Sequence, residues 1–184
     1  DQFLRPHGVQ SRPVSQTLPT NLGWSLIDLP RAIGHERLDV FHAPAYTAPL
    51  RGTVPLVLTI HDVSYERHPE WYPYRRDAIR RWFYRRCART ADVVITDSDF
   101  SRSEIAAAYG IDARYIKVVP LGVGTPFLTS TLPRPPADVK QPYVLHVGDL
   151  HVRRNLRTLV RALARLPSVS AHMSPPLLIL AGAD

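Results

Sequence analysis

The 184-residue sequence has only one cysteine, Cys87, and one methionine, Met173. A single cysteine excludes an intrachain disulfide and a cysteine-based metal cluster, and it fits a reducing compartment. No apolar run reaches the roughly 18 residues that a membrane-spanning helix needs, and no secretory signal is recognisable at the beginning. Because residue 1 is aspartate and the only methionine lies near the other end, we expect this chain to be part of a longer protein.

Acidic side chains are scarce relative to basic ones, with 16 Asp and Glu against 23 Lys and Arg, which gives a formal net charge of +7. Such an excess of positive charge favours an anionic partner, which can be a nucleotide, a nucleic acid or an acidic lipid. The hydrophobic content of 45% and the charged content of 21% are typical of a chain that buries a core. They exclude an intrinsically disordered protein.

Short apolar runs rich in β-branched residues alternate with segments of helical periodicity. We expect strands over 39–43, 54–60, 92–96 and 115–119, and helices over 22–33, 74–91 and 101–109. Gly34 and Gly110 are expected to end the first and the last of these helices. The spacing of Ser101 and Glu104 predicts a capping box at the start of the last one. This alternation predicts an α/β fold with a parallel sheet and right-handed crossovers.

Prolines crowd the middle of the chain, with six between Pro120 and Pro142. So many prolines exclude a central strand or a helix interior, and we predict a stiff interdomain linker over 128–141. A new β-α-β pattern follows, with a strand over 143–147, a helix over 154–166 and a strand over 177–180. The sequence therefore predicts a first domain over 1–127 and the start of a second domain over 142–184, which is too small to be stable alone.

The dipeptide His61-Asp62 directly follows the predicted strand over 54–60. In open parallel sheets, ligands bind in the crevice beyond the carboxyl ends of the strands. His61 is therefore a candidate to hydrogen-bond a sugar or to carry a proton. The alternative is that the pair only closes the next turn, with Asp62 accepting from backbone amides. The aromatic and proline-rich segment 65–73 is expected to form either a binding lid or ordinary packing.

Seven arginines lie in the predicted helix over 74–90. Ile79, Trp82 and Phe83 share one side of this helix, and we expect that side to pack against the protein. The arginines most simply form a solvated face, and the alternative is a patch that binds nucleic acid or a membrane surface. No zinc-binding spacing and no Gly-aromatic RNA signature accompanies them, which argues against nucleic acid.

Gly148 ends the strand over 143–147, and Arg153 and Arg154 follow at the expected opening of the next helix. The helix dipole disfavours each cation there by about 0.3–1 kcal/mol. A bound phosphate reverses this balance, because the free amides of a helix N-terminus bind anions. Each hydrogen bond to a charged oxygen contributes about 1.5–3 kcal/mol. The pair therefore indicates a phosphate or diphosphate site, and the alternative is that both arginines are merely solvated.

Four stretches resemble, in the same order, the group 1 glycosyltransferases. They are TIHDVSYERHPEWYP, RRCARTADVVITDSDFSRSEIAAAYGI, IKVVPLGVGTPF and YVLHVGDLHVRRNLRTLVRALARL. The resemblance covers roughly residues 39–184 and is nearest to bacterial mannosyltransferases of polysaccharide biosynthesis. It implies the GT-B fold, in which two Rossmann-like domains face each other across a cleft. The first domain would bind the acceptor and the second the sugar nucleotide.

The resemblance also implies roles for single residues. His61 would be catalytic, with its side chain at the transferred sugar, and the donor diphosphate would be bound by Gly148, Arg153 and Arg154. The cleft would be lined by Asp62, Ser98, Arg102 and Gly122, with Gly122 in the hinge. Two positions depart from the family pattern. Arg154 stands where a lysine is usual, which is not a neutral exchange at a phosphate site, and Gly124 stands in place of an aspartate.

For function, the resemblance implies retaining transfer of a hexose, with mannose among the candidates, from a nucleotide diphosphate sugar to a glycan or lipid-linked acceptor. It implies no metal, no cofactor besides this donor and no nucleic-acid partner. The expected location is the cytoplasm, with peripheral binding to the inner face of the membrane through the basic helix over 74–90. Two alternatives remain: a non-catalytic GT-B remnant that binds an anion, a glycan or a protein, and a sugar-nucleotide epimerase of the same fold.

Some parts of the family pattern have no counterpart in the chain. Nothing in residues 1–38 matches the family's Gly-rich first loop, and its nucleobase pocket and paired glutamates would follow Asp184. We therefore expect the 184 residues alone to lack transferase activity. We also expect them to associate through uncovered strand edges and apolar faces.

Overall fold

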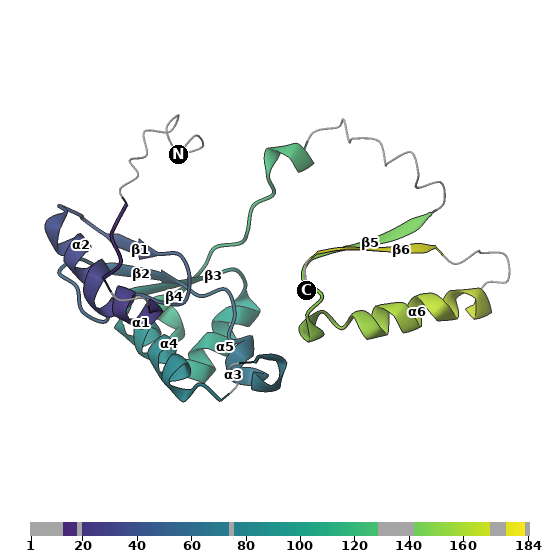
Figure 1. The fold of residues 1–184 in the computed structure, drawn as a ribbon, viewed down its shortest axis with the longest axis horizontal. Helices are drawn as coiled ribbons and strands as arrows, with labels where there is room; N and C mark the ends of the chain where they lie inside the picture. Colours follow the sequence, from purple (N-terminus) through teal and green to yellow (C-terminus); the bar gives the residue numbers. More distant parts are fainter. Residues whose placement is uncertain (1–12, 18–19, 74–75, 129–141, 170–175, 183–184) are drawn as a thin grey trace. The chain divides into compact units, whose positions relative to one another are not determined.

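The computed structural model describes the chain except for residues 1–12, 18–19, 74–75, 129–141, 170–175 and 183–184. The chain divides into two compact units, Asp1–Gly122 and Val123–Asp184, and each contains a parallel sheet with helices (Figure 1). The predicted α/β fold with parallel sheets is confirmed. The predicted linker over 128–141 lies, except for its first residue, outside the described residues.

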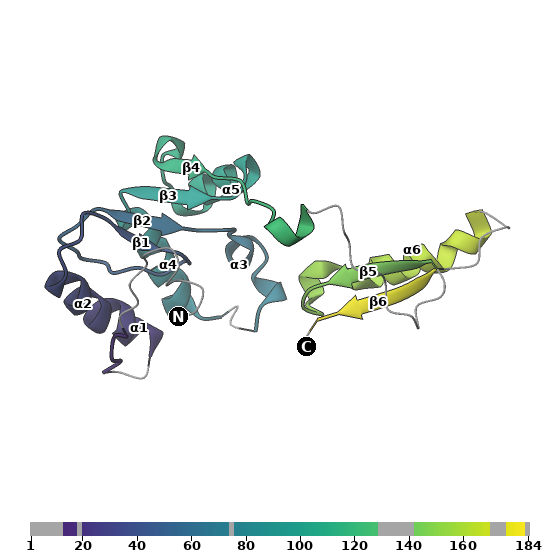
Figure 2. The same ribbon diagram turned by 90° about the horizontal axis from the view of Figure 1, so that it is seen from above.

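The first unit is built on a four-stranded sheet, and Figure 2 shows its strands side by side. In spatial order they are β1 (Phe41–Ala43), β2 (Leu56–Thr59), β3 (Val93–Thr96) and β4 (Ile116–Val118). All neighbours are parallel, and Leu58 pairs with Ala43 on one side and with Val94 on the other. Each strand lies within its predicted run and is shorter than that run. Parallel pairing places all four carboxyl ends at one edge of the sheet.

Helices connect these strands over one face of the sheet (Figure 1). Between β2 and β3 lie α3 (Ser64–Arg67), a 3-10 turn (Pro69–Trp71) and α4 (Ala78–Thr90), and β3 is joined to β4 by α5 (Asp99–Tyr109) and a further 3-10 turn (Ala113–Tyr115). The connections from β2 to β3 and from β3 to β4 run in the same direction along the sheet. Because such crossovers share the same right-handed sense, α4 and α5 lie on the same face of the sheet. The segment 65–73 is thus partly helical.

The core of the first unit lies between the sheet and these helices. Its largest buried side chains include Leu58, Ile60, Val94, Ile105, Tyr109 and Ile116. The buried hydroxyl of Tyr65 meets that of Tyr109, and burial raises the pKa of both phenols. Tyr65 is therefore a core residue. For this part of the segment, the structure agrees with ordinary packing and not with a binding lid.

Helix α4 begins four residues later than predicted, at Ala78. The cap is Asp77, whose Oδ1 accepts from the backbone N–H of Arg80 at 2.9 Å. The Arg80 side chain also donates to Oδ2, at 3.2 Å. These hydrogen bonds hold the pKa of the Asp77 carboxyl below its usual value. An aspartate at this position satisfies an amide that would otherwise have no partner in the first helical turn.

The predicted packing face of α4 was wrong for two of its three residues. Ile79 and Trp82 are 68% and 57% exposed, whereas Phe83 is buried. The buried side continues from Phe83 to Cys87 and Ala88, because these small side chains let the helix approach the sheet closely. Cys87 Sγ donates to the carbonyl of Ala48 at 3.3 Å, and burial raises the pKa of its thiol to about 11.

Helix α5 is capped by Ser98 and not by the predicted box of Ser101 and Glu104. Ser98 Oγ accepts from the backbone N–H of Ser101 at 3.1 Å. Glu104 instead pairs with Arg67 of α3, which donates through Nε at 2.6 Å and through Nη2 at 3.1 Å. The tertiary pairing with a guanidinium therefore replaced the predicted local one. Gly110 ends the helix in the left-handed region, at φ 64°, as predicted.

A helical segment near the N-terminus comprises α1 (Asn21–Gly23), a π-helical stretch (Trp24–Asp28) and α2 (Leu29–His35). The prediction of a helix over 22–33 is confirmed, but the helix continues through Gly34 to His35. The wide π turns end two residues before Pro30, which has no N–H to donate to the preceding turn. Gly34 lies inside α2 and does not end it, contrary to the prediction.

The second unit has the predicted β-α-β order, with β5 (Tyr143–Val147), α6 (Leu156–Val169) and β6 (Leu177–Ala181). The strands are parallel, with Leu145 opposite Ile179. Helix α6 begins after Asn155 and not at 154, because Asn155 adopts φ 52° and cannot continue a right-handed helix backwards. Tyr143, Leu145 and Val147 on one face of β5 are 39%, 51% and 70% exposed.

Candidate functional site

The carboxyl ends of β2 and β3 bring His61 and Asp97 together. His61 Nδ1 lies 2.9 Å from Asp97 Oδ2 and 3.2 Å from Oδ1. A carboxylate accepts, so Nδ1 carries the proton and the ring orientation is fixed. Nε2 is then the nitrogen that can act on a ligand. The His61 side chain is 43% exposed and that of Asp97 is 24% exposed, so the imidazole is accessible while its partner is largely covered.

Tyr46 contacts this pair from the loop after β1. Its ring meets that of His61 edge-on, with the centroids 6.2 Å apart, and it stacks on Tyr84 with the centroids 5.8 Å apart. Its backbone is left-handed, with φ 49°, and its N–H donates to the carbonyl of Thr59 at 3.0 Å. For a bulky residue this conformation costs about 1–3 kcal/mol. The fold therefore holds a strained aromatic residue against His61.

Asp62 forms the turn that the alternative interpretation of the His-Asp pair predicted. Its Oδ1 accepts from the backbone N–H of Ser64 at 2.8 Å and from Ser64 Oγ at 2.5 Å. Ser64 Oγ also contacts the hydroxyl of Tyr72. Asp62 thus closes the turn into α3, while His61 is turned toward Asp97. His61 and Asp62 therefore have different roles, and the sequence alone did not separate them.

The other three predicted cleft residues take part in local structure. Ser98 caps α5, and Arg102 Nη2 lies 2.9 Å from Oδ1 of Asp99, one turn earlier on the same helix. Gly122 is the last residue of the first unit, and a Cβ added there would meet no atom within 4 Å. The structure therefore shows no steric need for glycine at this position, and its predicted role in a hinge stays a prediction.

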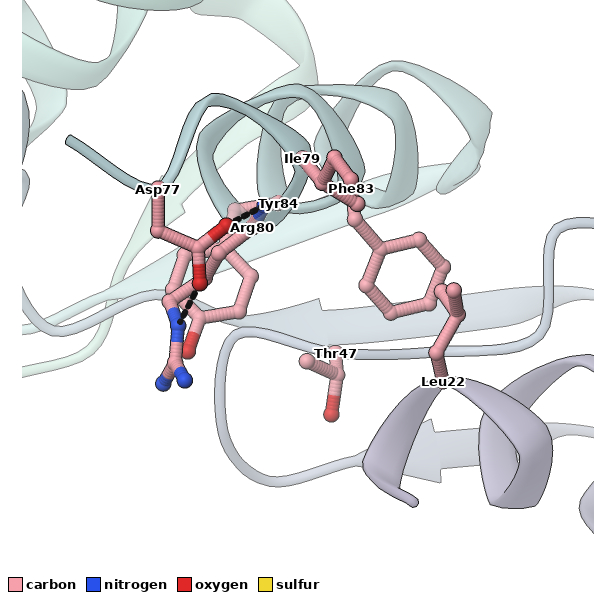
Figure 3. A pocket seen from close by; sticks show the side chains of 7 residues that line it. All are labelled: Leu22, Thr47, Asp77, Ile79, Arg80, Phe83 and Tyr84. Carbon is pink, nitrogen blue, oxygen red and sulfur yellow. Dashed lines mark hydrogen bonds and ion pairs between the residues drawn. The ribbon is translucent and has the colours of Figure 1, made fainter. Parts of the chain in front are cut away.

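Two pockets adjoin this edge of the first unit. One, of about 250 Å³, lies between the α3 segment and the start of α5 and includes Asp62 in its wall. The other, of about 230 Å³, lies between α1 and α4 (Figure 3). Tyr84 lines the second pocket and also stacks on Tyr46, so a row of neighbouring aromatic rings extends from this pocket to His61. Asp77 and Arg80 form its paired polar edge (Figure 3).

In the second unit, two glycines let the ends of β5 and β6 approach each other. Gly148 has φ 137°, and its N–H donates to the carbonyl of Ala181 at 2.9 Å. A Cβ on Gly182 would lie 1.9 Å from the oxygen of Gly148, so only glycine fits there. The guanidinium of Arg154 lies over Gly148, with Nη2 3.6 Å from where a Cβ would be. Gly148 and Arg154 are thus brought together.

The two arginines lie in a 3-10 turn (Val152–Arg154) that precedes α6. Arg153 N–H donates to Nδ1 of His151 at 3.3 Å. Asn155 Oδ1 accepts from Thr158 Oγ1 at 2.8 Å, which links this turn to the first turn of α6. A pocket of about 400 Å³ beside this turn is lined by Leu150, His151, Val152, Asn155, Leu156 and Arg157. The prediction that the arginines occupy the first turn of α6 was wrong, since the left-handed Asn155 separates them from it.

Three residues of these sites were not singled out from the sequence. Asp97 had a usable signal, because it follows β3 as His61 follows β2, and the ends of parallel neighbours meet. Gly182 had a weaker signal in its place at the end of a predicted strand. Tyr46 had none, since Ala-Tyr-Thr contains no residue that favours a positive φ.

The described part of the chain gives no sign of a metal centre or a transmembrane helix. No three His, Cys, Asp or Glu side chains in it are grouped as they would be around a metal ion. Its helices are too short or too polar to cross a membrane. Polar groups meet at the ends of strands at the His61–Asp97 pair in the first unit and at the Gly148–Arg154 turn in the second.

Comparison with known proteins places this geometry in a family. Residues 2–126, more than half of the chain, match Glycosyltransferase Family 4. The chain is 29% identical over 187 aligned residues to O-antigen chain mannosyltransferase B of Escherichia coli, an alignment that covers 96% of this chain and 46% of that protein. The chain thus spans about half the length of this curated relative. The resemblance to group 1 glycosyltransferases and the Rossmann-like, GT-B type of fold are confirmed, and the chain belongs to Glycosyltransferase Family 4.

Proposed function

We propose that the protein to which this chain belongs transfers a hexose from a nucleotide diphosphate sugar to a growing polysaccharide or a lipid-linked glycan, with retention of the anomeric configuration. The observation that carries this proposal is the His61–Asp97 pair at the carboxyl ends of β2 and β3 in a family member. The mannosyltransferase named among the relatives makes mannose the first sugar to test. The test is release of nucleoside diphosphate and formation of an α- or β-glycoside by full-length protein. Absence of product with every nucleotide sugar would count against it.

In this proposal, His61 acts on the transferred sugar through Nε2. Asp97 accepts from Nδ1 and keeps the imidazole in one tautomer. A ring held in this way can donate or accept a hydrogen bond at a sugar hydroxyl without rearrangement when the transition state forms. The Tyr46 ring also meets the imidazole, at a centroid distance of 6.2 Å.

The leaving diphosphate is assigned to the turn after β5. Arg154 over Gly148, the guanidinium of Arg153 and the backbone amides after Gly148 would stabilise the negative charge that develops on the leaving group. Stabilisation of the leaving diphosphate would then come from protein cations and amides and not from a resident metal or cofactor. The donor is then a substrate, and retention would be checked by the anomeric signals of the product in NMR.

The Arg154→Ala variant of the full-length protein is expected to bind GDP or UDP about tenfold or more weakly than the wild type, since one charge-assisted contact is lost. Isothermal titration calorimetry measures both affinities. Arg161→Ala is the matched control, because it removes the same charge from the exposed side of α6. Unchanged affinity in both Arg153→Ala and Arg154→Ala would show that the two arginines are merely solvated.

We propose further that the first unit associates with the inner face of the cytoplasmic membrane through the outer face of α4, defined by Ile79, Trp82 and Arg86. Ile79 and Trp82 are large apolar residues that remain exposed, and Arg86 is an exposed cation one turn after Trp82. Tryptophan beside arginine suits the interface between acyl chains and anionic headgroups. The net charge of +7 supports the same partner.

Full-length protein is expected to co-sediment with vesicles of phosphatidylglycerol and phosphatidylcholine in equal parts, and far less with phosphatidylcholine alone. In Arg86→Glu, the partition coefficient should fall about tenfold, because an attraction of about 1 kcal/mol becomes a repulsion. Trp82→Ala should lower it through lost apolar contact. Arg31→Glu on α2 reverses another exposed charge of the same unit and should leave most of the binding intact. Equal loss in all three variants would leave no role for this particular face.

A further inference from the structure

The pocket between α3 and α5 combines an aromatic wall with polar edges. It measures about 250 Å³, and we call it the Trp71 pocket. The residues that give it its chemistry are Asp62, Arg67, His68, Trp71, Phe100 and Glu104. Pockets of this kind, mostly apolar with a few placed polar groups, are typical of small-ligand sites. The turn of the second unit that is proposed to bind the diphosphate contributes none of these residues.

The aromatic wall is held in place before any ligand arrives. The rings of His68 and Trp71 are stacked, with centroids 4.0 Å apart and planes inclined by 11°. The 3-10 turn fixes this spacing, because Trp71 N–H donates to the carbonyl of His68 at 3.0 Å. His68 Nδ1 is also 3.2 Å from Oε1 of Glu70. Across the pocket, Phe100 is 77% exposed, which leaves its ring uncovered by the protein. The stacked His68–Trp71 pair is thus presented at little further ordering cost, and the Phe100 ring is open to contact from the other side.

The polar edges suit hydroxyl groups. Arg67 and Glu104 form a two-point ion pair, at 2.6 and 3.1 Å, on one edge of the pocket. The Asp62 carboxylate, held by Ser64, lies on another. Carboxylates accept from hydroxyls and a guanidinium donates to them. A pyranose has the matching surface, because its ring C–H groups form an apolar face and its hydroxyls point outward to the polar edges.

The pocket lies next to the proposed reaction centre. Asp62 directly follows His61, and Phe100 lies three residues after Asp97. The two walls therefore begin at the ends of β2 and β3, the same strands that carry the His61–Asp97 pair. A sugar in the Trp71 pocket would thus be bound by the first unit alone, while the donor is anchored through its diphosphate to the second.

We propose that the Trp71 pocket binds a hexose unit of the acceptor glycan, with Trp71 and Phe100 as the surfaces on which the sugar ring packs. This assignment rests on the proposed transferase function and deepens it, since it identifies residues that select the acceptor. The transferred sugar of the donor is the competing occupant, and the experiment separates the two.

The experiment uses full-length protein, a soluble α-linked mannotriose as acceptor and a nucleotide sugar that supports turnover. In Trp71→Ala, the KM for mannotriose is expected to rise about tenfold or more, whereas the KM for the donor stays within about twofold. Trp71→Phe should recover most of the acceptor affinity, because it restores an aromatic face. Phe100→Ala should raise the same KM, whereas Phe127→Ala should not, although both rings are 77% exposed.

Binding is also measured without turnover, by saturation-transfer NMR with mannotriose and by calorimetry with GDP or UDP. If the wild type transfers no sugar but mannotriose binding depends on Trp71, the proposed function fails and the pocket assignment stands. A rise in donor KM with unchanged acceptor KM would assign the pocket to the transferred sugar and overturn the inference. Unchanged values for both substrates in Trp71→Ala and Phe100→Ala, with nucleotide binding intact, would overturn it as well.

Discussion

Replacing His61 with alanine is expected to lower kcat for sugar transfer by about 10²–10⁴-fold, the range in which a positioned proton carrier acts. The affinity for GDP or UDP should stay within about twofold, since the diphosphate contacts lie in the second unit. Asp97→Asn should lower kcat less, because the imidazole remains but loses the carboxylate that fixes its tautomer 2.9 Å away. Initial rates at saturating donor and acceptor measure these changes.

The double variant of His61 and Asp97 distinguishes a positioning role for Asp97 from an independent one. If Asp97 acts only through the imidazole, His61→Ala/Asp97→Asn should be no slower than His61→Ala alone. His35→Ala, which removes an exposed imidazole from the end of α2, is the control for general effects of losing a histidine. A kcat within about threefold of the wild type in His61→Ala would remove this residue from the reaction.

Substituting alanine for Gly182 is expected to destabilise the second unit and to abolish nucleotide binding together. The new Cβ would lie 1.9 Å from the carbonyl oxygen of Gly148, far inside contact distance. The ends of β5 and β6 would have to separate, and the turn that carries Gly148 would move away from Arg154. Overpacking of this kind costs about 1–3 kcal/mol or more. Urea unfolding followed by circular dichroism measures the loss, and calorimetry with GDP or UDP measures the binding.

A matched substitution shows whether the effect is local. Gly34 lies in α2, and an added Cβ meets no atom within 4 Å. Gly34→Ala should therefore stabilise its helix by about 0.5–1 kcal/mol. Nucleotide binding should be retained in this control. If Gly182→Ala binds GDP or UDP as the wild type does, the turn is not held by the close approach of the two glycines.

The parallel sheets could be predicted because their signal is local. Runs such as the one over 54–60 are apolar with few polar breaks, and the helical patterns between them leave few other topologies. The ends of helices were predicted less well, since they depend on a single cap. Asp77 caps α4, and α6 begins after Asn155, which has a positive φ. Asparagine adopts a positive φ more readily than most residues, so the sequence could have indicated this second boundary.

The face that α4 buries could not be predicted from its residues. Ile79 and Trp82 are the apolar residues that periodicity assigns to the protein, but the helix packs through Phe83, Cys87 and Ala88. The small side chains of Cys87 and Ala88 at the contact favour this face. The arginines on every side of the helix obscured its hydrophobic periodicity. For the candidate sites, single residues were identifiable by type, as His61 and Arg154 were. Their partners depended on pairing between distant segments, as for Asp97, or on a tertiary hydrogen bond, as for Tyr46.

The left-handed backbone of Tyr46 is a strain that laboratory evolution would have little reason to remove. A glycine there would adopt the same φ of 49° and relieve a backbone strain of about 1–3 kcal/mol. The same exchange would delete the ring between His61 and Tyr84. Because that ring also packs against Tyr65 and the core, its loss costs at least as much folding free energy as the relieved strain returns, and selection for thermal survival alone would not favour glycine. Selection for sugar transfer would retain the tyrosine.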